Sequence, residues 1–208
     1  MSASGDLKDW IAPARTALLL IDMQLDFADP QGGLGLDGHD MTAPQAAVQQ
    51  AGLLADAARA AGVACVFVRL VTRPEDETPF LTEWKNRRDA SGGPLCRQGS
   101  RGAEFVGPQP KAGEMVFSKK RYSAFHGTGL DASLRGLGVD TLVVAGLTTE
   151  CCIESSVRDA YERDYHVFVV GDATACYDPA LHQAALKALT LNCAFQVNTS
   201  DVCCSWNK

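Results

Sequence analysis

Six short and almost uninterrupted apolar runs, spread along 208 residues, are the feature that most limits how this chain can fold. Apolar runs that are continuous rather than alternating are typical of strands buried on both faces of a parallel sheet. The runs lie at residues 16–21, 63–70, 114–118, 141–146, 166–170 and 194–199.

Segments with a helical pattern lie between these runs. Residues 43–61 and 130–137 are each followed by a glycine, which is common where a helix stops. Residues 150–164 place apolar side chains on one face, and residues 179–191 begin with a proline. Strands that alternate with helices predict an α/β fold, namely a single-domain, doubly wound parallel sheet of about six strands flanked by helices. In such a sheet, ligands bind beyond the carboxyl ends of the strands.

The composition is that of an ordinary globular protein, with 46% hydrophobic and 21% charged residues. A net charge of −6 and only two short cationic runs, WKNRRD and SKKRY, argue against a nucleic-acid surface. No apolar run approaches the ~18 residues that span a bilayer, and the N-terminus lacks a secretory pattern. We therefore expect one cytoplasmic domain over residues 1–208, with its eight cysteines as reduced thiols and with neither a nucleic-acid nor a membrane partner.

Residues 72–113 have no strong hydrophobic period and are rich in proline, glycine, arginine and aspartate. A segment of this length is too long for a plain connector, and loops of this kind usually carry function. We expect it to act as a lid or as an interface.

Two strands are predicted to end at charged residues. Asp22 follows four aliphatic residues directly, so its carboxylate would be partly desolvated, which costs several kcal/mol unless a partner is present. A structural carboxylate that caps a neighbouring loop is the alternative. Lys119 begins a run with Lys120 and Arg121, and such a run is often a solvated face. The three cations cannot all point one way where a strand ends, so one of them can face inward to meet a carboxylate.

A third strand is predicted to end at the stretch GLTTECCIESSVRDA, residues 146–160. If Thr149 is the N-cap of the following helix, Cys151 and Cys152 lie in its first turn, where the positive end of the helix lowers the pKa of a thiol. A free cysteine is more often a small buried apolar residue. Successive helix residues point about 100° apart, so only one of the two thiols can face the carboxyl edge of the sheet. Geometry alone does not choose between them.

Three stretches resemble the isochorismatase-like cysteine hydrolases: LLLIDMQLDF, SKKRYSAFHGTGLD and TLVVAGLTTECCIESSVRDAYERDYHVFVVGDAT. They occur in the family's order, and the resemblance covers nearly the whole chain. It implies that Asp22 is the acid/base aspartate, Lys119 the lysine, and Cys152 the nucleophile of the Gly-x-x-Thr-x-x-Cys motif. Cys151 occupies a variable position of that motif and keeps its interpretation as an apolar filler.

The resemblance also implies a mechanism. Asp22 would accept the thiol proton, Lys119 would steady both charges, and Cys152 would attack a carbonyl carbon to form a thioester acyl-enzyme. The backbone N–H groups of Thr148 and Cys152 would form the oxyanion hole. In the family this turn carries a non-proline cis peptide, which here would join Leu147 to Thr148.

Several alternatives stay open at this point. Members of the family without the cysteine hydrolyse the vinyl ether of isochorismate, and nicotinamidase-like members bind a metal through an aspartate and histidines after the second strand. This chain has the cysteine and no histidine there, so we expect amide hydrolysis with no metal and no cofactor. Asp37 and His39 form an Asp-x-His pair, but after the first strand, and GLGLDG at residues 33–38 lacks the context of a dinucleotide site. A vinyl ether hydrolase, a nicotinamidase-like amidase and a non-catalytic member are the alternatives.

Five residues are candidates for substrate binding because they flank the triad in sequence or lie in the long segment: Gln24, Phe27, Trp84, Tyr122 and Phe125. Each also fits a core position, except Trp84, which we expect to close over the site. Lys85, Arg87 and Arg88 are candidates for binding a substrate carboxylate, a solvated helix face being the alternative. We expect the substrate to be a small carbamoyl or ureido amide that releases ammonia. From the family we also expect a homo-oligomer, a dimer or tetramer.

Overall fold

The computed structural model describes residues 6–87 and 93–207, and it confirms the parallel sheet. Six strands lie in the order β3-β2-β1-β4-β5-β6, and every neighbouring pair is parallel. The strands are β1 (Thr16–Ile21), β2 (Ala64–Leu70), β3 (Met115–Lys119), β4 (Thr141–Leu147), β5 (His166–Ala175) and β6 (Phe195–Val197). All six apolar runs form strands, and the longest of them, β5, continues well beyond its apolar run.

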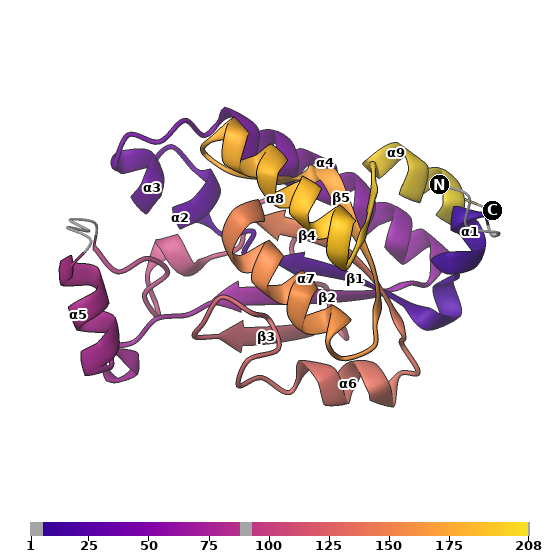
Figure 1. Ribbon diagram of the computed structural model, residues 1–208, viewed down its shortest axis with the longest axis horizontal. Helices are drawn as coiled ribbons and strands as arrows, with labels where there is room; N and C mark the ends of the chain where they lie inside the picture. The colour runs from indigo at the N-terminus through magenta and orange to yellow at the C-terminus, as the bar shows by residue number, and fades with distance from the viewer. Residues whose placement is uncertain (1–5, 88–92, 208) are drawn as a thin grey trace.

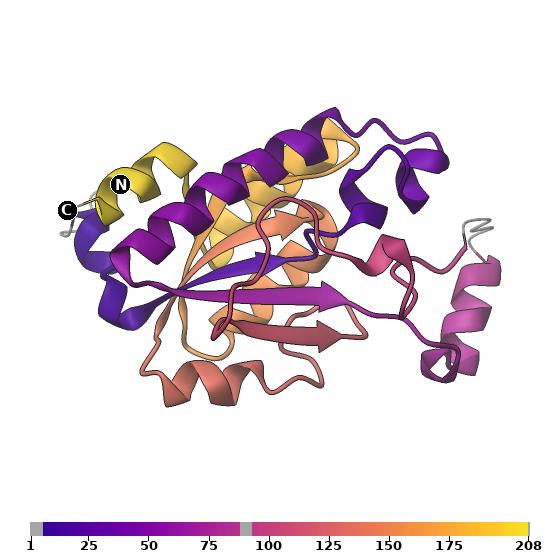
Figure 2. The same ribbon diagram turned by 180° about the vertical axis from the view of Figure 1, so that it is seen from behind.

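Helices cover both faces of the sheet, as expected for a doubly wound fold (Figures 1 and 2). One face carries α1 (Leu7–Trp10), α4 (Thr42–Ala61) and α9 (Thr199–Trp206). The opposite face carries α6 (Leu130–Gly136), α7 (Glu154–Tyr161) and α8 (Pro179–Asn192). Each layer packs on its own apolar cluster, so the central strand β1 is buried throughout. Leu18 and Leu20 face one cluster and Leu19 faces the other, and each such side chain contributes roughly 1.5–3 kcal/mol by leaving water.

The helix boundaries follow from local signals. Helix α4 ends at Gly62, whose φ of 77° is the left-handed conformation that glycine adopts without strain. Helix α8 begins with a proline, and the Asp178 side chain accepts a hydrogen bond from the Ala180 N–H. The two ends of the described chain meet where the Trp206 indole Nε1 donates to the Ile11 carbonyl at 2.9 Å.

The loops beyond the carboxyl ends of the strands hold the short helices α2 (Leu25–Ala28) and α3 (Gly33–Leu36). The long segment contains α5 (Pro79–Arg87) and two 3₁₀ turns, η2 (Pro74–Asp76) and η3 (Arg101–Ala103). Helix α5 stands away from the body, at the end of the molecule opposite the two termini (Figure 1). Its role as a lid or interface stays a prediction.

A close approach between β1 and β4 sets the geometry of the carboxyl edge. Gly146 pairs with Ile21, and a Cβ atom at this glycine would lie 2.0 Å from the Ile21 carbonyl oxygen. The φ of Gly146 is 141°, which residues with a side chain rarely adopt. Glycine therefore allows the two strands to deliver Asp22 and the turn after β4 to neighbouring positions.

Candidate active site

Asp22, Lys119 and Cys152 meet at the carboxyl edge of the sheet, although they come from three different strand ends. Asp22 follows β1, Lys119 ends β3, and Cys152 lies in a π-helical turn, η4 (Thr149–Ile153), after β4. The Lys119 Nζ atom is 2.7 Å from Asp22 Oδ2 and 3.3 Å from Cys152 Sγ. The residues are 0%, 1% and 6% exposed, respectively, so the contact is shielded from water.

Asp22 is held in a constrained backbone position. Its φ is 54°, a left-handed conformation that costs a non-glycine residue about 1–3 kcal/mol. Its N–H donates to the Val68 carbonyl at 2.8 Å, and its own carbonyl accepts from the Gln24 N–H at 2.8 Å. Its carboxylate pairs with Lys119, and weaker contacts with the Cys152 thiol and the Leu70 N–H also lower its pKa. A buried acceptor with spare capacity is suited to take up a proton.

The Lys119 ammonium group joins the side chains of Asp22 and Cys152. Besides Asp22 and Cys152, the Nζ atom donates to the Arg121 carbonyl at 3.0 Å. An ammonium group has three donors, so these contacts use all of them. The carbonyl of Arg121 is a contact that the sequence did not reveal, because it depends on how the chain turns after β3.

The charges of the three groups are coupled. Burial raises the pKa of the Asp22 carboxyl, against the opposing effect of Lys119. Contact with the Cys151 thiol, burial and the Asp22 carboxylate raise the pKa of Cys152 well above its ordinary value. Burial disfavours the charge on Lys119, but its two partners outweigh burial and raise the pKa of the ammonium. One buried ammonium offsets one negative charge, so Asp22 and Cys152 do not ionise together in the resting site.

This result differs from the expectation that the start of the helix lowers the pKa of the Cys152 thiol. The neighbouring carboxylate and burial outweigh the helix terminus, so the resting nucleophile is a neutral thiol beside an ionised base. The hydrogen bond from Cys152 lowers the pKa of Cys151, which is half-buried. Ease of ionisation therefore does not select Cys152. The direct contact of Cys152 with Lys119 favours Cys152, and its role as nucleophile stays a prediction.

The turn that carries the cysteines begins one residue earlier than expected. Thr148, with φ −97° and ψ 154°, precedes the turn, and the Ile153 N–H donates to its carbonyl at 3.1 Å. Thr148 rather than Thr149 therefore occupies the N-cap position, and the Thr149 hydroxyl contacts the Nδ1 atom of His182 from α8 at 2.8 Å. The peptide bond between Leu147 and Thr148 is cis, as the resemblance implied. The oxyanion role of the Thr148 and Cys152 N–H groups stays a prediction.

Two side chains that the sequence did not single out support this turn. The Ser156 hydroxyl donates to the Cys152 carbonyl at 2.6 Å and accepts from the Ala124 N–H at 2.9 Å. Ser156 thereby connects the turn that contains Cys152 to the loop after β3. The Glu150 carboxylate accepts from the Thr148 hydroxyl at 2.8 Å. The position of Ser156, one helical turn after Cys152, is a signal that could have identified it.

Three of the five candidate substrate-binding residues lie in the interior. Gln24 is fully buried, and its Nε2 donates to the carbonyls of Leu70 at 2.9 Å and Ala103 at 3.0 Å. Both amide donors are therefore used by the backbone, where they join β2 to η3. Phe27 and Phe125 are 8% and 4% exposed and pack in the two apolar clusters. A direct contact of any of the three with substrate stays a prediction.

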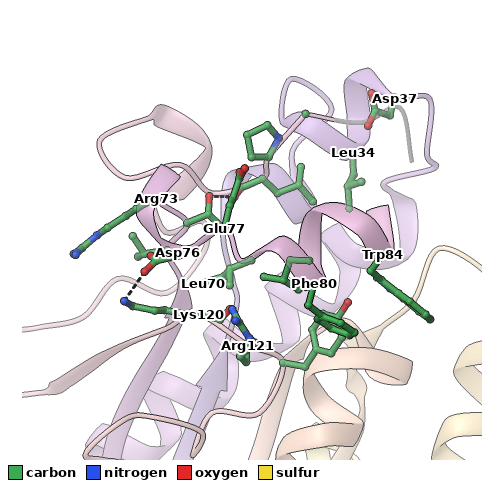
Figure 3. Close-up of a pocket in the computed structure, with 17 residues that line it drawn as sticks. Leu34, Asp37, Leu70, Arg73, Asp76, Glu77, Phe80, Trp84, Lys120 and Arg121 are labelled. Atoms are coloured by element: carbon green, nitrogen blue, oxygen red, sulfur yellow. Dashed lines mark hydrogen bonds and ion pairs between the residues drawn. The ribbon is translucent and has the colours of Figure 1, made fainter. Parts of the chain in front are cut away.

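Trp84 and Tyr122 line a cavity of about 630 Å³ beside the triad (Figure 3). Its walls come from the loops after β1, β2 and β3 and from α5. The side chains of Asp22, Lys119 and Cys152 do not line this cavity. Its floor includes Leu70 and Val71, and the Val71 N–H donates to the Lys119 carbonyl at 3.0 Å. The cavity therefore opens next to the triad rather than on it.

Of the three cations expected to bind a substrate carboxylate, Arg87 is described, and it does not line this cavity. Arg87 is exposed and donates to Glu83, four residues before it, with a distance of 3.0 Å between Nε and Oε1. Arg88 lies outside the described residues, and so does the side chain of Lys85. Among the described residues, the cations that line the cavity are Arg73, Lys120 and Arg121.

The histidines and acidic groups of the described chain do not assemble as metal ligands. No three histidine, cysteine, aspartate or glutamate side chains in residues 6–87 and 93–207 gather closely enough to hold an ion. The ring of His39 contacts that of Tyr177, with centroids 4.8 Å apart, and His182 binds Thr149. Over the same residues, no helix is both long and apolar enough to cross a membrane.

The sequence model of the isochorismatase domain matches residues 16–201. The chain belongs to the isochorismatase family. Within this family, it is 34% identical to ureidoacrylate amidohydrolase RutB of Methylobacterium radiotolerans over 187 residues, which is 84% of this chain and 72% of that protein. The expected family membership is thereby confirmed.

Solved structures of isochorismatase-like proteins share the fold. A cysteine hydrolase from Pseudomonas syringae pv. phaseolicola superposes with a TM-score of 0.82 at 27% identity, over 95% of this chain and 94% of that one. The N-carbamoylsarcosine amidase from Thermoplasma acidophilum superposes with a TM-score of 0.71 at 29% identity, over 89% of this chain and 96% of that one.

Proposed function

We propose that this protein hydrolyses the C–N bond of a small carbamoyl or ureido amide and releases ammonia, with Cys152 as the nucleophile. The observation that carries this proposal is the buried contact of Cys152 with Lys119, which also binds Asp22. The relatives support it, because ureidoacrylate amidohydrolase and N-carbamoylsarcosine amidase are both named as amide hydrolases.

The geometry supports a two-stage reaction. Asp22 takes the thiol proton as Cys152 attacks the carbonyl carbon, and Lys119 holds the single negative charge as it passes from carboxylate to sulfur. Asp22 then returns the proton to the leaving nitrogen, and ammonia departs from a thioester. Water that gives a proton to the same carboxylate hydrolyses the thioester and restores the free thiol. The N–H groups of Thr148 and Cys152 stabilise the oxyanion, and loss of one such donor costs about 3 kcal/mol in other enzymes.

The test is a screen for ammonia release by the wild type, Cys152→Ala and Cys151→Ala. The panel contains ureido acids, N-carbamoyl amino acids, biuret and nicotinamide, with isochorismate hydrolysis followed separately. We expect a ureido or N-carbamoyl compound to be the best substrate, with activity lost in Cys152→Ala and retained in Cys151→Ala. Cys151 is the matched control because it lies in the same turn.

Each alternative has its own outcome in this screen. A best substrate of nicotinamide would favour a nicotinamidase-like enzyme. Equal turnover of isochorismate by the wild type and Cys152→Ala would favour an ether hydrolase that acts through Asp22. No turnover of any compound would favour a non-catalytic member. Prolonged chelation is expected to leave turnover unchanged, and a loss restored by zinc, iron or manganese would contradict metal independence.

We also infer a homo-oligomer, a dimer or tetramer, in which residues 72–113 contribute to an interface or lid. The support is the exposure of large apolar side chains around the cavity, where Phe80 is 68%, Tyr122 60% and Trp84 49% exposed. Light scattering at micromolar concentration tests this, and a monomer near the chain mass of 22.2 kDa would contradict it. A cytoplasmic location is consistent with all eight cysteines being free thiols.

A further inference from the structure

The cavity beside the triad is lined by two arginines that form no ion pair with a carboxylate of residues 6–87 and 93–207. Three of its other charged groups are paired, because Lys120 Nζ lies 2.5 Å from Asp76 Oδ1 and Glu77 Oε1 lies 3.1 Å from the Nη2 atom of Arg97. The Asp37 carboxylate also lines the cavity. Within the described parts of the chain, neither Arg73 nor Arg121 has a carboxylate within ion-pair distance. The Arg121 Nη1 atom donates to the Lys120 carbonyl at 3.0 Å, which leaves further donors of its guanidinium available.

Of these two arginines, Arg121 is the one whose backbone contacts the triad. Arg121 lies two residues after the triad lysine, and its carbonyl accepts a hydrogen bond from Lys119 Nζ. In Figure 3 the Arg121 side chain is drawn below Leu70, among the residues that line the cavity, whereas the Arg73 guanidinium extends outward from the other lining side chains. Arg121 therefore links the lining of the cavity to the triad lysine through its own backbone.

The surroundings strengthen the attraction of this guanidinium for an anion. Leu70, Phe80 and Tyr122 line the same part of the cavity and supply apolar surface beside Arg121. In such surroundings the effective dielectric constant is lower than in water, and a guanidinium binds a carboxylate through two parallel hydrogen bonds. An acidic group suits this place better than a neutral one, because a neutral group would leave the guanidinium donors without a charged partner.

We propose that Arg121 binds a carboxylate at the non-reacting end of the substrate and so selects ureido or N-carbamoyl acids over neutral amides. This proposal rests on the proposed amide hydrolysis at Cys152. It assigns the anion-binding role to the loop after β3 rather than to the cations of α5. Loss of a charged hydrogen-bonding partner corresponds to a roughly 10- to 100-fold weaker affinity for the acid.

The test measures binding rather than turnover, so that it does not depend on catalysis. The Cys152→Ala protein is titrated calorimetrically with N-carbamoyl-β-alanine and, separately, with its neutral methyl ester. The same titrations are made after adding Arg121→Met, Arg121→Lys or Arg87→Met to Cys152→Ala. Arg87→Met is the matched control, because Arg87 is a nearby arginine that does not line the cavity. Circular dichroism and thermal melting establish that each variant is folded.

We expect the parent to bind the acid more tightly than the ester. Arg121→Met should weaken acid binding about 10- to 100-fold and remove the preference over the ester, Arg121→Lys should retain part of it, and Arg87→Met should leave it intact. No binding of the acid to the parent, no preference for it, or equal losses for acid and ester in a folded Arg121→Met would overturn the proposal. If the acid binds through Arg121 but the wild type releases no ammonia from it, the proposed function fails instead.

Discussion

The three triad side chains are almost completely buried, whereas the aromatic side chains around the neighbouring cavity are half exposed or more. In the first region, three strand ends and a glycine contact fix the positions of charged groups that cannot be accommodated elsewhere in the core. In the second region, loops and the projecting helix α5 supply the walls. The difference fits the proposed division of tasks, in which the buried contact supports the chemistry and the exposed walls select the molecule that is held against it.

The largest expected effect comes from Asp22→Asn, which removes the base but keeps its shape. We expect amide hydrolysis to fall about 10³-fold, within the 10²–10⁴-fold range of general base catalysis. Because the competing carboxylate is gone, Lys119 then favours the Cys152 thiolate, so alkylation of Cys152 by iodoacetamide should become faster. Mass mapping of the alkylated cysteines measures this.

Asp140→Asn is the matched control, because Asp140 forms a half-exposed ion pair with Arg15. Exposed pairs contribute only about 0–1 kcal/mol, so this variant should behave like the wild type. Retained activity in Asp22→Asn, or slower alkylation of Cys152, would show that the carboxylate is not the base.

Gly146→Ala should destabilise the buried region strongly. The added Cβ atom meets the Ile21 carbonyl at 2.0 Å, and we expect a loss of about 3 kcal/mol in the free energy of unfolding. Gly52→Ala in α4 is the control, because its Cβ atom meets no atom within 4 Å, and we expect a gain of up to about 1 kcal/mol. Urea denaturation measures both. Similar stabilities for the two variants would contradict the close approach of β1 and β4.

The pH dependence of kcat/KM reports on the coupled charges. Activity requires the ionised Asp22 carboxylate, whose pKa is raised by burial. Activity should therefore be lost, as the pH falls, at a pH above the ordinary carboxyl range of about 4. Lys119 lowers this pKa, so the acidic limb of the residual activity in Lys119→Met should move to higher pH. Lys120→Met should leave the limb in place, since Lys120 is paired with Asp76. An acidic limb below pH 4 in the wild type would contradict this.

The smallest expected effect comes from Trp84→Ala in the exposed wall. We expect KM to rise several-fold, while the free energy of unfolding changes by less than about 1 kcal/mol, because the side chain is 49% exposed. Tyr161→Ala on α7 is the control, since Tyr161 is 51% exposed and does not line the cavity. Equal effects of the two variants on KM would remove Trp84 from the substrate-binding wall.

The difference between the two regions also explains what could be predicted from the sequence. The strands and the positions of Asp22, Lys119 and Cys152 at their ends follow from apolar runs that are local in the chain. The partners of Gln24 could not be predicted, because Ala103 lies 79 residues away and reaches it through the folding of the long segment. The contact between the Thr149 hydroxyl and His182 likewise depends on the packing of α8 against the turn η4. Phe27 lies close in sequence to Asp22, and Phe125 lies close to Lys119. The direction of their side chains, however, depends on the packing of the two apolar clusters.

The most direct test of the central claim is to trap the acyl-enzyme. The wild type is mixed with its best amide substrate, quenched in acid within the first turnovers and digested for mass mapping. We predict an acyl adduct on Cys152 that is absent from Cys152→Ala and still present on Cys152 in Cys151→Ala. An adduct on Cys151, or full amide hydrolysis by Cys152→Ala, would contradict the assignment of Cys152 as the nucleophile.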